Sequence, residues 1–124
     1  MGYQAHLPRQ VPIEAYGNGG FRFGGMSHKG SLLCLPSGIW GWQATSVEGL
    51  DQEALAPVLG LGGGLSFLLL GTGRALVRPS REIRKLFEDA GLWLEVMDTG
   101  AAARTYNVLL AEGRVIAAAL IAVE

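Results

Sequence analysis

The stretch LWLEVMDTGAAARTYNVLLAEGRVIAAALIAV, residues 92–123, decides the fold class of this chain. Its apolar start, 92–97, predicts a buried strand, and the helical pattern that follows begins at a Thr99 cap and ends at Gly113. The last run, 114–123, is rich in alanine, which also suits a helix. The glycine before it and the Val and Ile residues near both its ends favour a strand. The stretch therefore predicts a strand, a helix and a second strand.

The segment before it shows the same alternation of strand and helix. Residues 65–70 (LSFLLL) are apolar on both faces, which is typical of a strand covered on both sides. A helix is predicted within 78–91, with Ser80 as its N-cap and Gly91 as its end. Its buried stripe consists of Ile83, Leu86, Phe87 and Ala90. Strands that alternate with helices need crossover connections, so the second half predicts a βαβαβ unit with a parallel or mixed sheet.

The first third of the chain consists of short alternating apolar runs separated by glycine-rich turns. The runs predict strands at 11–16, 21–23, 31–35 and 38–42, joined as an antiparallel meander. Asp51 caps a short helix, which Pro57 ends or kinks. We therefore expect one α/β (α+β) domain over residues 1–124, in which the N-terminal meander joins the C-terminal βαβαβ unit on a mixed central sheet. Residues 1–12 are expected to form a loosely ordered arm.

Composition is that of a compact globular protein. The 124 residues are 49% hydrophobic and 17% charged, and the formal net charge is −1. This balance gives no general attraction to nucleic acid. Cys34 is the only cysteine and lies in an apolar run, so we expect a buried, inert thiol. Two histidines and one cysteine do not provide the ligand spacing of a zinc site, and neither a metal nor a cofactor is expected.

The expected compartment is the cytoplasm. No apolar run approaches the roughly 18 residues of a transmembrane segment. The first twelve residues, MGYQAHLPRQVP, lack the apolar core of a signal peptide. A lone cysteine also fits a reducing environment.

Two turns form a candidate ligand site, provided that the strands before them are parallel neighbours. A Gly-Thr-Gly turn follows the strand at 65–70, and glycines allow backbone N–H groups to approach an anion. The helix that begins at Thr99 adds free N–H groups and a positive dipole end. The candidate anion-binding residues are Gly71, Thr72, Gly73, Thr99, Arg104 and Asn107. The competing interpretation is structural: a tight turn, a cap at Thr99, an ion pair at Arg104 and a loop held by Asn107.

Basic residues are concentrated in one segment. Half of the ten Lys and Arg residues lie between positions 74 and 85. The candidate partner-binding residues are Arg74, Arg78, Arg81, Arg84 and Lys85, together with Trp40 and Trp42. Such a surface suits an acidic protein or peripheral contact with an anionic membrane. Because Glu82, Glu88 and Asp89 partly neutralise the segment, it is also compatible with a solvated helix face, and the tryptophans with core positions.

Three motifs carry a family resemblance: GNGGFRFGG (17–25), LLLGTG (68–73) and MDTGAAARTYNVLLAEGR (97–114). In this order they resemble the mitochondrial complex I assembly factor 3 family, with its bacterial relatives and the adipogenesis-associated domain proteins. The resemblance extends from about Ile13 to Val123. It implies one α/β domain with a mixed sheet. For mitochondrial members it implies a non-enzymatic role in assembling respiratory NADH dehydrogenase beside a partner assembly factor, and no catalytic residues to transfer.

Two functions follow from these observations. The first is a non-catalytic assembly or interaction module, a bacterial-type relative of the complex I assembly factor with a possible link to membrane-protein assembly, that presents the basic segment to a protein partner. The second is a small-molecule or anion-binding protein, or an enzyme, that uses the Gly-Thr-Gly turn and the helix N-terminus at Thr99. No Ser-His-Asp arrangement or Cys-x-x-Cys motif is evident, and the family resemblance favours the module.

Overall fold

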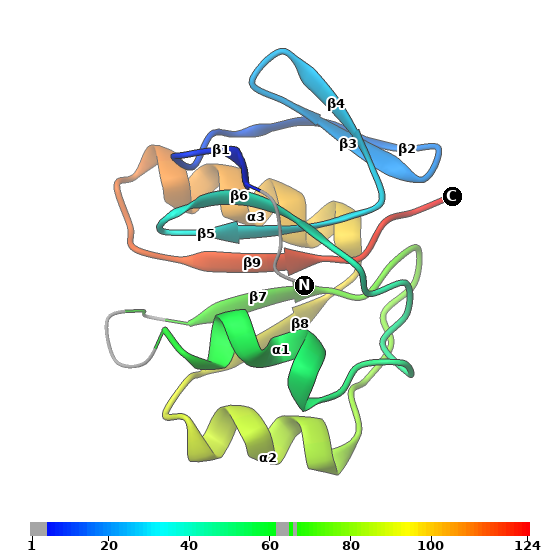
Figure 1. The fold of residues 1–124 in the computed structure, drawn as a ribbon, viewed down its shortest axis with the longest axis vertical. Helices are drawn as coiled ribbons and strands as arrows, with labels where there is room; N and C mark the ends of the chain where they lie inside the picture. Colours follow the sequence, from blue (N-terminus) through cyan, green and yellow to red (C-terminus); the bar gives the residue numbers. More distant parts are fainter. Residues whose placement is uncertain (1–4, 62–64, 66) are drawn as a thin grey trace.

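The computed structural model describes residues 5–61, 65 and 67–124, and all structural statements below concern these residues. The strands are β1 (Ala5–Leu7), β2 (Ile13–Gly17), β3 (Gly20–Phe23), β4 (Met26–Lys29), β5 (Ser31–Leu35), β6 (Gly38–Trp42), β7 (Leu68–Gly71), β8 (Leu94–Met97) and β9 (Ala117–Leu120). The helices are α1 (Gln52–Leu59), α2 (Arg81–Asp89) and α3 (Thr99–Ala111). Figure 1 shows their arrangement.

The strands form two sheets. The larger sheet has six strands in the order β1-β6-β5-β9-β7-β8, and β2, β3 and β4 form a separate antiparallel sheet. Strand β7 pairs in parallel with both β8 and β9, whereas β5 pairs antiparallel with β6 and β9. The expected α/β (α+β) fold with a mixed sheet is therefore confirmed. The predicted meander corresponds to β2–β4 only, since β5 and β6 belong to the larger sheet.

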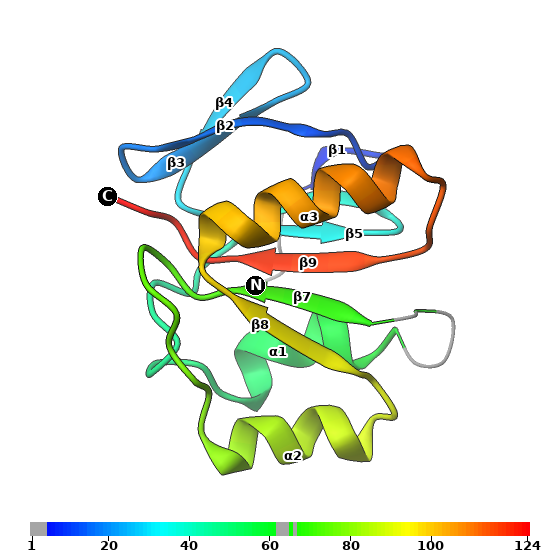
Figure 2. The same cartoon turned by 180° about the vertical axis from the view of Figure 1, so that it is seen from behind.

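The two faces of the large sheet are covered differently. Helices α1 and α2 lie on one face, and α3 with the small sheet lies on the other (Figures 1 and 2). Alternation along β7 sends Leu68 and Leu70 to the α1–α2 side and Leu69 to the α3 side. Small side chains on both partners let α3 lie close to β9, where Ala102 and Ala103 pack in the same cluster as Ala118. The alanine-rich last run thus contains a fully buried strand, β9, as predicted, although Arg114 and Val115 before it are exposed.

Several elements differ from the sequence-based expectation. Strand β4 was expected to be part of a turn, because its sequence MSHK has no apolar alternation; its backbone pairing with β3 forms the strand. Helix α1 continues past Pro57 to Leu59, because the fully buried Leu55 and Val58 fix it on the sheet. Of the expected strand at 65–70, only the end belongs to β7, and Ser66 lies outside the described residues.

The N-terminal arm and β8 also differ in detail. Of the expected loose arm, residues 1–4 lie outside the described residues, and Ala5–Leu7 form β1. Strand β8 was expected to be buried, yet it is half-buried, because it is the last strand of the sheet and has a neighbour on one side only. Trp93, expected within this strand, lies just before it and is 67% exposed.

Candidate interaction surface

The two predicted turns lie side by side. Parallel pairing places Gly71 opposite Met97, so the Gly-Thr-Gly turn and the start of α3 share one edge of the sheet. The backbone N–H of Thr72 donates to the carbonyl oxygen of Met97 at 2.9 Å, and the N–H of Thr99 donates to Gly73 at 2.8 Å. We call this contact the β7–α3 junction: residues 71–73 against residues 97–99. Sequence analysis predicted its position correctly.

The polar groups of the β7–α3 junction are bonded to one another. The Thr99 hydroxyl donates to the carbonyl oxygen of Ile121 at 2.7 Å and accepts from the Gly73 N–H at 2.9 Å, and the Thr99 side chain is fully buried. Thr99 was expected to cap α3, but Asp98 is the N-cap, and its carboxylate accepts from Ala101 N–H at 2.9 Å. These bonds occupy the amides of Thr72, Gly73 and Thr99, which an anion would need.

Thr72 and Gly71 have structural roles in the same junction. The Thr72 hydroxyl donates to Ala75 and accepts from the N–H of Val77, so it holds the chain that leaves β7. At Gly71 a Cβ atom would lie 3.0 Å from the Thr99 hydroxyl oxygen and 3.0 Å from a methyl group of Leu120. Glycine at position 71 therefore allows the close approach of α3 to the sheet.

Arg104 and Asn107 lie on another side of α3. Both line a shallow pocket of about 360 Å³ beside Tyr16 on β2. The Asn107 amide accepts from the backbone N–H of Ile13 at 2.8 Å and donates to its carbonyl oxygen at 2.9 Å. Asn107 thus ties β2 to α3, in line with the structural interpretation. Arg104 is exposed, and within the described residues it forms no salt bridge.

Cys34 and Tyr106 are fully buried in the core on the α3 side of the sheet. Burial raises the pKa of the Cys34 thiol to about 12, so the thiol is protonated at neutral pH. Burial, and then the neighbouring Cys34, raise the pKa of the Tyr106 phenol. The phenol donates to the carbonyl oxygen of Val11 at 2.9 Å. Both side chains are neutral core groups, as expected for Cys34. Among the described residues, no group of His, Cys, Asp and Glu side chains is arranged to bind a metal ion.

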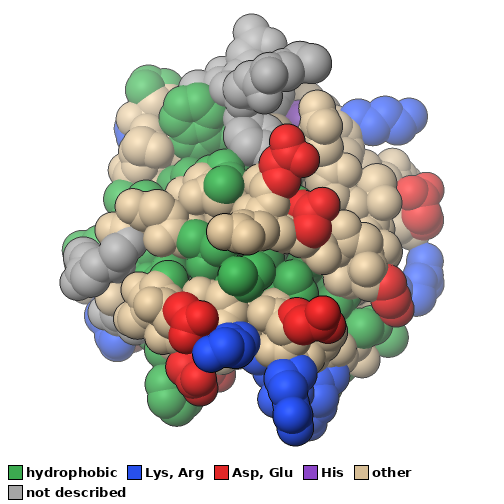
Figure 3. Space-filling model, turned by 60° about the horizontal axis from the view of Figure 1, so that its bottom comes forward, with side chains coloured by type: hydrophobic (Ala, Val, Ile, Leu, Met, Phe, Trp, Pro, Cys, Tyr) green, Lys and Arg blue, Asp and Glu red, His purple; other side chains and the backbone are tan. Residues whose placement is uncertain are grey.

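The basic segment lies on α2 and on the loop before it. Arg81, Arg84 and Lys85 are exposed, and Lys85 contacts Asp89 at 3.4 Å across one helical turn. Figure 3 shows that basic and acidic side chains alternate over the end of the molecule that carries α1 and α2. The Arg74 guanidinium donates to the Glu124 carbonyl oxygen at 2.9 Å, so it reaches the chain end instead. The surface is therefore a mixed one with an excess of arginine and lysine around α2.

The two tryptophans of β6 face the core together. Trp42 is 4% exposed, and its indole N–H donates to the carbonyl oxygen of Ala54 on α1 at 2.9 Å. Trp40 is half-buried, and its indole N–H donates to Ser37 at 3.1 Å. Trp42 is therefore a core residue, and Trp40 alone retains accessible surface.

A groove that sequence analysis did not single out lies between α2 and β8. We call it the β8 groove; its volume is about 540 Å³. Its lining residues are Leu76, Arg78, Pro79, Arg84, Phe87, Glu88, Leu92, Trp93, Leu94 and Val96. Leu76 and Trp93 are 64% and 67% exposed, more than any other large hydrophobic side chain of the described residues. Exposed apolar groups gathered in this way are typical of interaction sites.

Only one sequence signal could have indicated the β8 groove. Gly91 ends the helix, and Trp93 is the second residue of the strand predicted after it. In a strand covered on both faces, this indole would have to be buried. The buried Leu92 and the exposed Trp93 alternate, which indicates a half-covered strand. Leu76 carries no such signal, because its exposure depends on the path of the loop between β7 and α2.

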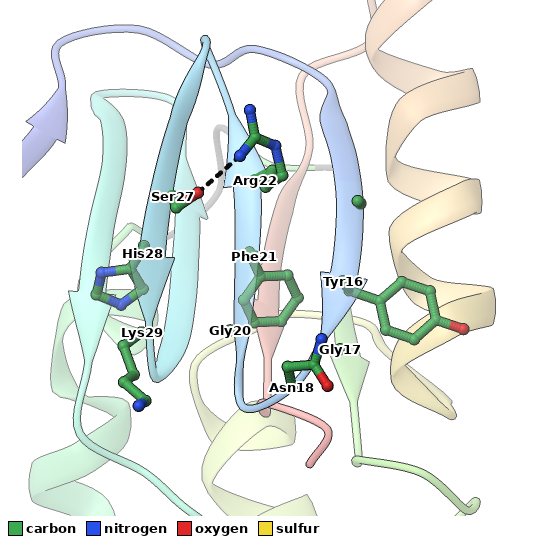
Figure 4. A pocket seen from close by; sticks show the side chains of 10 residues that line it. Tyr16, Gly17, Asn18, Gly20, Phe21, Arg22, Ser27, His28 and Lys29 are labelled. Atoms are coloured by element: carbon green, nitrogen blue, oxygen red, sulfur yellow. Dashed lines mark hydrogen bonds between the residues drawn. The ribbon is translucent and has the colours of Figure 1, made fainter.

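A second hollow, of about 420 Å³, lies over the small sheet. Figure 4 shows side chains from all three strands around it, and Gly17 and Gly20 lie where the turn joins β2 to β3. The Arg22 guanidinium donates to the Ser27 hydroxyl at 2.9 Å, and the His28 ring contacts the Ser31 carbonyl oxygen at 3.1 Å. Three of the lining side chains, Arg22, Ser27 and His28, are thus bonded within the protein.

The chain is a mixed α+β domain. The polar groups of its β7–α3 junction are bonded to one another, and its most exposed large apolar side chains, Leu76 and Trp93, lie beside the edge strand β8. Residues 13–121 match the family described as a protein of unknown function, DUF498/DUF598. The chain belongs to this family. Among the described residues, none of the helices combines the length and apolarity needed to cross a bilayer.

Relatives extend the comparison. An uncharacterized protein of Rhodobacter capsulatus is 38% identical over 90% of this chain and 84% of its own length. The NADH dehydrogenase [ubiquinone] 1 alpha subcomplex assembly factor 3 of Xenopus tropicalis is 34% identical over 88% of this chain, and the match spans 60% of that protein. The chain thus spans about three fifths of that assembly factor. The family resemblance seen in the sequence is confirmed.

A solved structure is also similar. The crystal structure described as that of an outer membrane protein from Bartonella henselae is 50% identical and superposes with a TM-score of 0.90. The match covers 96% of this chain and the whole of that chain.

Proposed function

We propose that this chain is a non-catalytic interaction module that binds a protein partner during assembly of a respiratory NADH dehydrogenase. The observation that carries the proposal is the match, over most of this chain, to proteins named as complex I assembly factor 3. A domain that acts by binding a partner through its surface needs no catalytic group. The surface we assign to the partner is the exposed end around α2.

Two features of that end support the assignment. Arg81, Arg84 and Lys85 project from α2, and their charge attracts an acidic partner over the range of the Debye length. The β8 groove beside them supplies apolar area for affinity. The Bartonella henselae relative, described as an outer membrane protein, supports a partner that lies at a membrane. We place the chain itself in the cytoplasm, in peripheral contact with the membrane that holds the respiratory NADH dehydrogenase.

The ligand-site alternative receives less support from the same structure. An anion at the β7–α3 junction would have to displace bonds that Thr72, Gly73 and Thr99 make with their neighbours. Arg104 and Asn107 lie beside β2, where Asn107 is already bonded to Ile13.

Charge reversal tests the proposal. In cells that make this chain, Arg81, Arg84 and Lys85 are changed together to Glu, and cross-linked partners are identified by mass spectrometry. The proposal predicts a subunit or assembly factor of the respiratory NADH dehydrogenase as the partner of the wild-type chain, and its loss in the triple variant. Less of the assembled dehydrogenase is expected on native gels.

A matched control separates this effect from net charge. Arg9, Arg22 and Lys29 are also exposed, and they lie away from α2 on the N-terminal loop and the small sheet. Changing these three to Glu gives the same net charge and should leave the partner bound. Equal loss in both triple variants, or a set of partners without any component of the dehydrogenase, would contradict the proposal. Circular dichroism checks that both variants fold.

A further inference from the structure

The free edge of β8 carries the inference that goes furthest. Strand β8 is the last strand of the large sheet, and its bonds to β7 use alternate residues. The N–H of Leu68 donates to the Trp93 carbonyl oxygen at 2.8 Å, and the N–H of Thr72 donates to that of Met97 at 2.9 Å. In a parallel strand the N–H and C=O of one residue point to the same side. The groups of Leu94 and Val96 therefore point away from β7.

The side chains of the same residues line the β8 groove. Leu94 and Val96 face the α2 side of the sheet, where Leu76 and Trp93 continue the apolar surface. Both strand residues are half-buried. An edge strand with unpaired backbone groups is a template for a further strand. Here the template lies directly beside apolar side chains that could receive alternate residues of that strand.

We propose that the β8 edge binds an extended segment of the partner protein as an added β-strand. The groove-facing residues of that segment, every second one along it, are apolar against Leu94 and Val96 and acidic against Arg78 and Arg84. This proposal rests on the proposed function and adds the binding mode and the chemistry of the partner. Strand addition takes its affinity from main-chain hydrogen bonds and its specificity from side-chain pockets.

Charge decides which occupant fits. Arg78 and Arg84 line the groove and are exposed, with Glu88 as the acidic residue of the lining. Arg81 and Lys85 follow on α2. Acidic side chains on the groove-facing side of an incoming strand would meet this arginine-rich rim. A second copy of this chain, paired through a two-fold axis, would bring the same arginines together, because a two-fold interface places one patch against itself. An acidic segment is therefore the occupant that the groove favours.

The test uses short synthetic peptides and the full chain. In the first peptide every second residue is threonine, and the residues between the threonines, which share one face of the strand, are valine and glutamate in turn. The control peptide of equal length has lysine in place of each glutamate. Binding is followed by NMR on the labelled protein. The acidic peptide should bind about tenfold or more tightly than the basic one. It should also protect the amide hydrogens of Leu94 and Val96 from exchange with solvent, because these groups become bonded to the added strand.

N-methylated peptides test the main-chain bonds. Methyl groups on the valine and glutamate nitrogens block one edge of the peptide, and methyl groups on the threonine nitrogens block the other. Strand addition predicts that one of these two isomers binds and that the other does not. If both bind equally, or if Leu94 and Val96 gain no protection, the peptide recognises charge alone and the proposal is overturned. If the free protein is a dimer in which the amides of Leu94 and Val96 are already protected, a second copy occupies the β8 edge and the proposal is overturned.

Variants connect the test to the cell. Trp93→Ala removes the most exposed apolar wall of the groove, and Val108→Ala removes an exposed side chain of α3 at a distance from it. The first should weaken both the acidic peptide and the cellular partner by about tenfold or more, and the second should leave both unchanged. If Trp93→Ala leaves the cellular partner bound while the triple reversal on α2 removes it, strand addition fails and the proposed function stands.

Discussion

Strands β8 and β9 both pair in parallel with β7, yet their environments are opposite. Every residue of β9 is buried, and α3 lies against it through small side chains. Strand β8 is half-buried, with an unpaired edge and a groove lined by exposed Leu76 and Trp93. On the β9 side polar groups such as the Thr99 hydroxyl are bonded within the chain. On the β8 side, no further strand of the described residues pairs with the edge that faces away from β7. The first side stabilises the fold and the second can serve a partner.

The largest expected effect is on the β9 side. Thr99→Val keeps the shape of the side chain but leaves the Gly73 N–H and the Ile121 carbonyl without their partner. Each buried group left unbonded costs about 1–3 kcal/mol, so the loss of two partners should lower the free energy of unfolding by about 2–6 kcal/mol. Urea unfolding measures it. Thr99→Ser retains the hydroxyl and should cost about 1 kcal/mol. An unchanged midpoint for Thr99→Val would show that the junction does not stabilise the fold.

A smaller effect is expected where α3 holds the small sheet. Asn107→Ala removes both hydrogen bonds to Ile13, and the free energy of unfolding should fall by about 1–2 kcal/mol. Amide exchange in β2 and β3 should become faster. The exposed neighbour Arg104 provides the matched control, since Arg104→Ala should change stability by less than about 0.5 kcal/mol. Equal effects of the two substitutions would mean that β2 is held by other contacts.

The buried thiol gives a pH-dependent prediction. In the folded chain the pKa of Cys34 is raised from 9.0 to about 12, so the unfolded chain loses this proton first as the pH rises. The stabilisation is complete below pH 9 and is lost progressively between pH 9 and about 12. From pH 8 to pH 10 the wild-type chain should lose about 1 kcal/mol more than Cys34→Ala. Parallel pH profiles of the two chains in urea unfolding would contradict a buried, protonated thiol.

Sequence patterns predicted the elements that depend on local signals. Apolar alternation located β5 and β6, and Ser80 and Gly91 bounded α2 as expected. Two polar residues in succession were harder to assign: Asp98 and Thr99 both suit an N-cap, and the structure uses the first as the cap and the second to bond β7 to β9. The choice depends on strand β9, which is remote in sequence, so a local pattern does not contain it.

The proposed binding surface was predicted only in part from the sequence. The basic residues of α2 were identified from the sequence, but the β8 groove was not. The groove depends on the order of the strands in the sheet, and the residues of β8 and β9 do not indicate which of the two strands lies at the edge. Both are short apolar runs after a glycine stop. Trp42 shows the converse, because its alternation with Trp40 indicated a shared face but not which of the two is buried beneath α1.

Native-state amide exchange tests the difference between the two strands most directly. The hydrogens of Ala118 and Ala119 on β9 should exchange slowly, as should those of Glu95 and Met97, which face β7. Those of Leu94 and Val96 should exchange far faster, giving alternate protection along β8. Uniform protection along β8 in the monomer would show that its edge is already covered, and would contradict an open strand beside the groove.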